Sequence, residues 1–151
     1  MHMKYVSTKR YGHEIGLTAC FRQWRAESHC RFLHGYALAV RFEFGANELD
    51  VRNWVVDFGS LKSLKARIES TFDHKTLVAL DDPQRAEFMR LHKLGVIDMV
   101  EVEATGCEKF AELIFDTTEI WLKDAGYAPR VKLLEVEVAE HGANSAIVRA
   151  P

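Results

Sequence analysis

The sequence predicts an α+β domain in which helices cover one face of an antiparallel sheet. Segments near both ends of the chain alternate apolar and polar residues, as half-buried β-strands do. Two segments in the middle carry apolar residues at the three- and four-residue spacing of amphipathic helices. Strands, then helices, then strands favour an α+β arrangement. At 151 residues, without repeats, linkers or low-complexity tracts, the chain fits one domain over residues 1–151.

The first strands are predicted in the N-terminal third. Alternation predicts strands at Glu14–Phe21 and His34–Phe44, separated by a polar, irregular loop at Arg22–Phe32. A short third strand is predicted at Trp54–Phe58, after a connection that contains Asn and Asp. One face of the first strand carries Ile15, Leu17, Ala19 and Phe21, and one face of the second carries His34, Tyr36, Leu38, Val40, Phe42 and Phe44.

Helices are predicted in the middle of the chain. Ser60–Phe72 has an apolar stripe, with Ser60 or Asp57 near its N-cap. A short helix is predicted to begin at the Asp-Asp-Pro of residues 81–83 and to reach about Lys93. A second long helix is predicted over Cys107–Asp124, with Gly126 as its stop signal. The stripe of the first helix comprises Leu61, Leu64, Ile68 and Phe72, and the inward face of the long one comprises Phe110, Leu113, Ile114, Ile120 and Trp121.

Strands are predicted again towards the C-terminus, at Gly95–Val102, Val131–Ala139 and Ser145–Arg149. Alternation along the second of these sets Val131, Leu133, Glu135 and Glu137 against Lys132, Leu134, Val136 and Val138. The segment 81–102 lies outside the motifs described below, and the sequence indicates no function for it.

Charge and cysteine content limit the function classes. Lys and Arg number 20 and Asp and Glu 22, and the net charge of −2 argues against nucleic-acid binding through bulk charge. Three cysteines without CxxC spacing predict free thiols in a reducing compartment. The sequence shows neither a secretory h-region nor an apolar stretch of about 20 residues. We therefore expect a cytoplasmic protein that binds neither membranes nor nucleic acids.

Cys30 is the first candidate for chemistry. It lies in the predicted loop together with Arg22, Arg25 and Arg31. Cationic neighbours stabilise a thiolate, so this position favours an acidic, reactive thiol. The alternative is a thiol buried beneath the loop.

Three further places carry polar groups that suit a binding site. Asp73 beside His74 can orient the imidazole for proton transfer, although a histidine that compensates a helix dipole is the commoner explanation. Glu140 can accept two parallel hydrogen bonds from the NH and NH2 edge of a guanine-like ring, or it is a solvated strand end. His34 and Tyr36 have the spacing of a metal-binding pair, but tyrosine is an uncommon zinc ligand, which favours an aromatic core position.

Taken together, these segments resemble the 6-pyruvoyl-tetrahydropterin synthase / 6-carboxy-tetrahydropterin synthase family, the latter belonging to queuosine biosynthesis. Cys30–Tyr36 is similar to the family's C-x-x-L-H-G-H, and Asn53–Lys62 to its V-x-D-F-x-x-L-K. Phe72–Leu77 is similar to L-D-H-x-x-L, and Gly106–Glu108 to the T-S-E or T-T-E that precedes the second helix. With Glu140, these motifs occur in family order over residues 17–149.

The resemblance implies the tunnelling fold, a β-β-α-α-β-β unit that forms barrels in a homo-oligomer such as a hexamer, with active sites between subunits. The family's substrate is 7,8-dihydroneopterin triphosphate. The implied roles are a proton-transferring thiolate at Cys30, a proton relay from a neighbouring subunit at Asp73 and His74, and a pterin anchor at Glu140 helped by Cys107 and Glu108. The expectation that the triphosphate meets Arg22, Arg25 and Arg31 rests on charge and not on a motif.

The sequence departs from the family at the zinc ligands, which are three histidines. His34 matches one of them, whereas Phe21 and Tyr36 occupy the other two positions. Cys20 becomes a ligand only if the match of the first strand is shifted by one residue. Because a catalytic zinc site needs three protein ligands, we expect a metal-independent site and no other cofactor.

Two functional interpretations follow from the resemblance. The first is a lyase that acts on 7,8-dihydroneopterin triphosphate or a related reduced pterin through Cys30, Asp73 and His74. The second is a non-catalytic, oligomeric module that binds a pterin or purine. A third interpretation is an oligomeric scaffold, which rests only on the ability of unpaired strand edges to pair with strands of other subunits.

Overall fold

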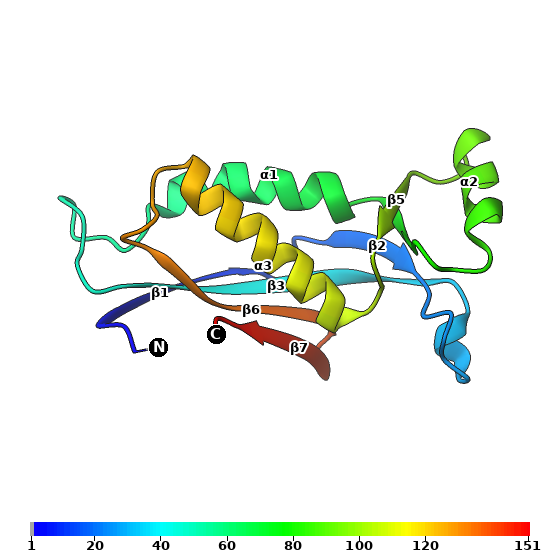
Figure 1. The fold of residues 1–151 in the computed structure, drawn as a ribbon, viewed down its shortest axis with the longest axis horizontal. Coiled ribbons are helices and arrows are strands. Elements are labelled where there is room, and N and C mark those ends of the chain that lie inside the picture. The colour runs from blue at the N-terminus through cyan, green and yellow to red at the C-terminus, as the bar shows by residue number, and fades with distance from the viewer. Residues whose placement is uncertain (1) are drawn as a thin grey trace.

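Residues 2–151 are described by a computed structural model, in which seven strands form one sheet and three α-helices lie outside it (Figure 1). Short 3₁₀ turns occur at His29–Arg31 and Phe58–Ser60. The elements, in chain order, are β1 Tyr5–Tyr11, β2 Leu17–Phe21, β3 His34–Ala46, α1 Leu61–Phe72, β4 Lys75–Ala79, α2 Arg85–Lys93, β5 Met99–Val102, α3 Cys107–Asp124, β6 Lys132–His141 and β7 Asn144–Arg149.

The sheet is mixed, with the strand order β5-β4-β2-β3-β6-β7. The long strand β3 pairs with β2 through its first half and with β1 through its second, while β6 occupies its opposite edge. The pairings of β3 with β1, β2 and β6, and of β6 with β7, are antiparallel, as predicted. β4 pairs with β2, and β5 with β4, in parallel, so the expectation of a wholly antiparallel sheet is corrected.

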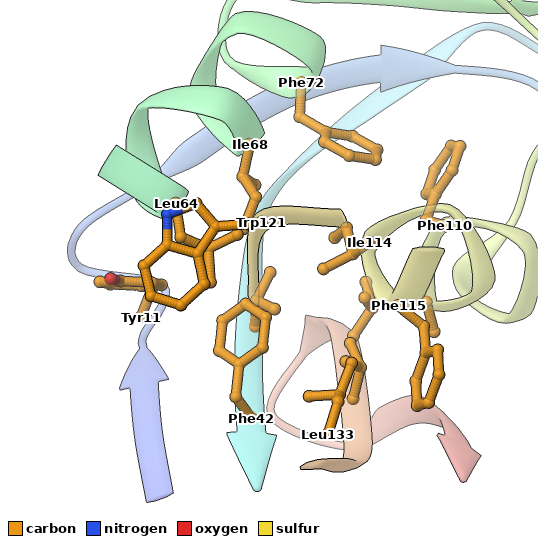
Figure 2. Close-up of a cluster of buried hydrophobic side chains, with 14 of the residues drawn as sticks. Tyr11, Phe42, Leu64, Ile68, Phe72, Phe110, Ile114, Phe115, Trp121 and Leu133 are labelled. Atoms are coloured by element: carbon orange, nitrogen blue, oxygen red, sulfur yellow. The ribbon is translucent and has the colours of Figure 1, made fainter. Parts of the chain in front are cut away.

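The two long helices lie over the same sheet face, which confirms the predicted α+β layering (Figure 1). All four residues of the α1 stripe are buried. From α3, Phe110, Ile114 and Trp121 join this core (Figure 2), whereas Ile120 is 56% exposed and does not point inward as predicted. None of the helices within residues 2–151 combines the length and the apolar character needed to cross a bilayer.

Several strand predictions are corrected by the structure. Residues 14–16 form a turn with Gly16 at a φ of 69°, so β2 begins only at Leu17. Residues 54–58 are irregular, although Val55 and Val56 are buried there as they would be in a strand. Of Gly95–Val102 only the last four residues form β5, and neither β1 nor β4 was predicted.

A β-bulge in β6 explains why its alternation was misread. Glu43 of β3 pairs with Glu135, but the next residue, Phe44, pairs with Leu133, which leaves Leu134 as the extra residue. Such an insertion moves the following side chains to the other face of the sheet. Leu133 and Val136 are therefore both buried, although the predicted alternation placed them on opposite faces.

Candidate active site

A cavity of about 390 Å³ lies between the loop after β2, the N-terminus of α3 and the turn between β6 and β7. Its volume falls within the usual range of ligand pockets, roughly 300–1,000 Å³. Six of the residues singled out from the sequence line it, namely Phe21, Cys30, His34, Cys107, Glu108 and Glu140. The chain thus brings together side chains that lie more than 100 positions apart.

Cys30 lies in the 3₁₀ turn His29–Arg31, and its backbone NH donates to the Ser28 hydroxyl, 3.4 Å away. The backbone of this loop is closed on itself, because the amide of Gln23 donates to the Cys30 carbonyl over 2.9 Å. The loop is also fixed to the segment before α3, since the Thr105 hydroxyl donates to the Arg22 carbonyl over 2.7 Å. These bonds hold the thiol at the wall of the cavity.

The arginines of this loop are largely engaged by other groups. Arg22 forms two hydrogen bonds with the buried carboxylate of Asp82, at 2.8 and 2.6 Å. Arg25 pairs with Asp81 over 2.8 Å, and Arg31 donates to the carbonyls of Glu27 and Ser28. Burial by itself opposes ionisation of Asp82, but the Arg22 pair and the Gln84 amide hold its pKa below the usual range. All three guanidinium nitrogens of Arg22 are therefore bonded to other protein groups, whereas the exposed Arg25 uses only one of its nitrogens.

The N-terminus of α3 supplies the second thiol of the cavity. Gly106 precedes the helix with a φ of 113°, a conformation that L side chains rarely adopt. Burial, with Glu140 and Glu108 nearby, raises the pKa of Cys107 to about 11, so this thiol is protonated at neutral pH. Glu140 accepts a hydrogen bond from the Asn144 side chain over 3.2 Å.

Three rings from β2 and β3 form an aromatic cluster on the cavity side of the sheet, which we define as Phe21, His34 and Tyr36. Phe21 is the cross-strand partner of His34, with ring centroids 5.3 Å apart. Tyr36 meets His34 edge-on at 5.3 Å and Phe21 at 6.0 Å. The predicted shared strand face of His34 and Tyr36 is confirmed, and the register adds Phe21 to it. Burial, together with the charges of Glu140, Cys30 and Cys107, raises the pKa of Tyr36, so the phenol keeps its proton.

This cluster does not fit a zinc ion. His34 can offer one ligand atom, whereas Phe21 has none and tyrosine is a poor one. The alternative ligand Cys20 is corrected by the strand register, because it pairs with Gly35 and so lies on the opposite sheet face from His34. Within residues 2–151 no group of three or more His, Cys, Asp and Glu side chains is arranged to hold a metal ion.

Neither Asp73 nor His74 lines this cavity. His74 lines a second hollow, together with Thr18, Cys20, Lys75 and Asp98. The backbone of Thr18 holds the pair, since its NH donates to the Asp73 carboxylate over 3.1 Å and its carbonyl accepts from the His74 NH. Asp73 Oδ1 lies 3.0 Å from His74 Nδ1, and the imidazole is 81% exposed. The pair thus has the geometry of an oriented imidazole, but within one chain it shares no cavity with Cys30.

The sequence interpretation missed Asp81, Asp82 and Asn144. The two aspartates lie about 60 positions from the arginines they bind, and their only sequence signal was the Asp-Asp-Pro read as a helix start. Asn144 follows Glu140 within a hairpin turn, and a correct prediction of that turn could have placed it beside the carboxylate.

Fold and site together define an α+β protein with a ligand cavity at the end of its sheet. The family model for 6-pyruvoyl tetrahydropterin synthase matches residues 12–151, and the chain belongs to this family. A relative, the 6-carboxy-5,6,7,8-tetrahydropterin synthase of Aquifex aeolicus (strain VF5), is 28% identical over 158 residues, which cover 95% of this chain and 97% of the relative.

Solved structures share the fold at lower identity. An uncharacterized protein from Wolinella succinogenes superimposes with a TM-score of 0.81 at 22% identity, covering 97% of this chain and 98% of the other. The 6-pyruvoyl tetrahydropterin synthase of Plasmodium vivax superimposes with a TM-score of 0.69 at 14% identity, covering 97% and 99%. These likenesses confirm the expected fold, and the family confirms a tetrahydropterin synthase-like function in its general class.

Proposed function

We propose that this protein is a lyase that acts on 7,8-dihydroneopterin triphosphate or a related reduced pterin without a metal. The observation that carries the proposal is the convergence of Cys30, Glu140, Phe21 and His34 on one cavity, in a chain of this family. The free thiols suit a reducing compartment, and we place the protein in the cytoplasm.

Each cavity wall supports one part of the proposed reaction. Glu140 accepts two hydrogen bonds from the NH and NH2 edge of the pterin ring, and Asn144 orients its carboxylate. Cys107 and Glu108 bound the ring at the start of α3. The thiol of Cys30 exchanges a proton with the side chain of the pterin, and catalysis by a positioned acid or base contributes about 10²–10⁴-fold.

Asp73 and His74 join this chemistry from a neighbouring copy of the chain in the proposed oligomer. Two features support such an assembly. His74 is exposed and oriented but remote from the cavity of its own chain. Within residues 2–151, β1 and β7 each pair on one side only, so both can accept a strand from another copy.

Pterin binding and turnover test the proposal. We expect the purified protein to quench pterin fluorescence on binding and to convert 7,8-dihydroneopterin triphosphate to a product that chromatography resolves. Cys30→Ala should lower turnover about 100-fold or more while binding persists. Glu140→Gln should weaken binding about tenfold, whereas Glu137→Gln, an acid on the opposite face of the same strand, should not.

Metal analysis belongs to the same experiment. We expect turnover to survive a chelator, and stoichiometric zinc that is lost on His34→Ala would contradict the metal-independent part of the proposal. If no pterin binds, the proposal of a pterin lyase is contradicted altogether.

A second candidate is a pterin- or purine-binding module without turnover. The single histidine in the aromatic cluster favours it, because residues 2–151 hold no group of three side chains arranged to ligate a metal. Tight binding of pterins or purines with no product under any condition would decide for this candidate.

A further inference from the structure

Most of the hydrogen-bonding side chains around the cavity already have partners within the protein. The Thr105 hydroxyl donates to the Arg22 carbonyl, and the Ser145 hydroxyl donates to Glu137. The Ser28 hydroxyl accepts from the Cys30 amide. Glu140 is an acceptor only, because a carboxylate carries no proton. Few groups therefore remain that could donate a hydrogen bond to an oxygen of a bound ligand.

One ring nitrogen of His34 already has a hydrogen-bond partner as well. Its Nδ1 lies 2.6 Å from the carbonyl oxygen of Phe32. Because a carbonyl can only accept, Nδ1 carries the proton, and Nε2 of the neutral ring is left as an acceptor. His34 thus offers the cavity a lone pair and not a donor.

Tyr36 is the exception. Within residues 2–151 its hydroxyl makes no hydrogen bond. Its ring packs against the rings of His34, Phe21 and His141, with centroids 5.3, 6.0 and 6.1 Å away. Packing against three aromatic neighbours restricts the phenol ring, so an uncommitted O–H donor is pre-oriented. Its neighbours Phe21 and His34 line the cavity.

We propose that the Tyr36 hydroxyl recognises the oxygen-bearing side chain of the bound pterin by donating a hydrogen bond to it. This inference rests on the proposed function and assigns the side-chain specificity of the same site. A ring anchored at Glu140 leaves its substituent facing Cys30, Phe21 and His34, which line the same cavity. Tyr36 lies directly against Phe21 and His34. There an apolar floor of Phe21 accepts the carbon atoms of the substituent, and Tyr36 supplies the one polar contact that orients it.

Two ligands that differ only in the substituent test this contact. Neopterin carries hydroxyls on its side chain, and 6-methylpterin presents a methyl group at the same place. We expect the wild-type protein to bind neopterin about tenfold more tightly, the effect of about one hydrogen bond. Tyr36→Phe should reduce this preference to less than about twofold and leave the affinity for 6-methylpterin nearly unchanged.

The matched control is Tyr127→Phe, which removes a phenol that hydrogen-bonds Ser60 at the start of α1 and should keep the wild-type preference. A preference that survives Tyr36→Phe, or a wild-type protein without any preference, overturns the inference while the proposed function stands. Equal loss of both ligands shows that Tyr36 only supports packing, and also overturns it. If neither ligand binds the wild-type protein, the proposed function itself fails.

Discussion

At the scale of single residues, two thiols of the same cavity have different surroundings. Cys107 opens α3 beside two carboxylates, and burial is the largest cause of its high pKa, with Glu140 and Glu108 adding to it. Cys30 lies in the loop after β2, where Ser28 and Gln23 hold its backbone. The fold thus keeps the Cys107 thiol protonated at neutral pH, and the proposed proton transfer falls to Cys30.

Alkylation rates should separate these thiols. With a pKa of about 11, Cys107 is almost entirely protonated at pH 7.5, so iodoacetamide should modify it about 100-fold more slowly than an ordinary thiol. Its rate should rise about tenfold per pH unit up to pH 11. Mass spectrometry of the labelled peptides measures both thiols in one sample. A Cys107 rate that levels off below pH 9 would contradict the assigned environment.

At the scale of elements, the connection between β4 and α2 clamps the loop that carries Cys30. Arg22 and Asp82 are 20% and 2% exposed, whereas Arg25 and Asp81 are 65% and 53% exposed. An ion pair contributes more when it is shielded from water and when both of its hydrogen bonds are well formed. The segment 81–102, which has no motif of its own, therefore supports the site through Asp82.

Asp82→Asn should loosen this loop. It leaves Arg22 with a weaker partner and should lower the free energy of unfolding by about 1–3 kcal/mol. Amide hydrogen exchange should accelerate in residues 22–31 but not in α1. Because the pKa of Asp82 is lowered in the folded state, its contribution is present above pH 4 and is lost as the pH falls below that value.

The control is Asp81→Asn, because the Arg25–Asp81 pair is exposed. We expect it to lower the free energy of unfolding by less than about 1 kcal/mol. Equal effects of both substitutions on exchange in the loop would show that the buried pair has no special role.

The elements also show what the sequence could and could not reveal. The stripe of α1 was predictable because one helix face must be buried over about three turns. The shared face of His34 and Tyr36 followed from alternation, whereas the place of Phe21 beside them came from the family resemblance. β4 was missed because a central strand of five residues, four of them buried, shows no alternation. The Arg22–Asp82 pair was unpredictable because local sequence does not indicate contacts over 60 positions.

At the scale of the whole molecule, one chain divides its chemical groups between two hollows. Cys30 and Glu140 line the first, and His74 lines the second. An assembly that places the second hollow of one copy against the first hollow of the next would complete every site, and a closed ring of this kind is a usual outcome of head-to-tail association.

Subunit mixing tests this division. Cys30→Ala and His74→Ala should each be inactive alone, but their co-assembly should restore about a quarter of the wild-type turnover, because that fraction of sites receives both intact residues. Turnover is measured after the two variants are co-expressed. The control is a mixture of the separately expressed variants under conditions in which their subunits do not exchange. A mixture as inactive as its parents would show that both residues act within one chain.

Strand β2 contributes to both hollows. Its Thr18 backbone holds Asp73 and His74, and three residues later Phe21 forms the floor of the cavity, about 10 Å along the strand. In a shared assembly each β2 thus belongs to two consecutive sites. A genetic lesion that distorts this strand would disable both, so a cell that carries one normal and one altered copy of the gene would keep about a quarter of its sites and not a half. Such an allele would be partially dominant.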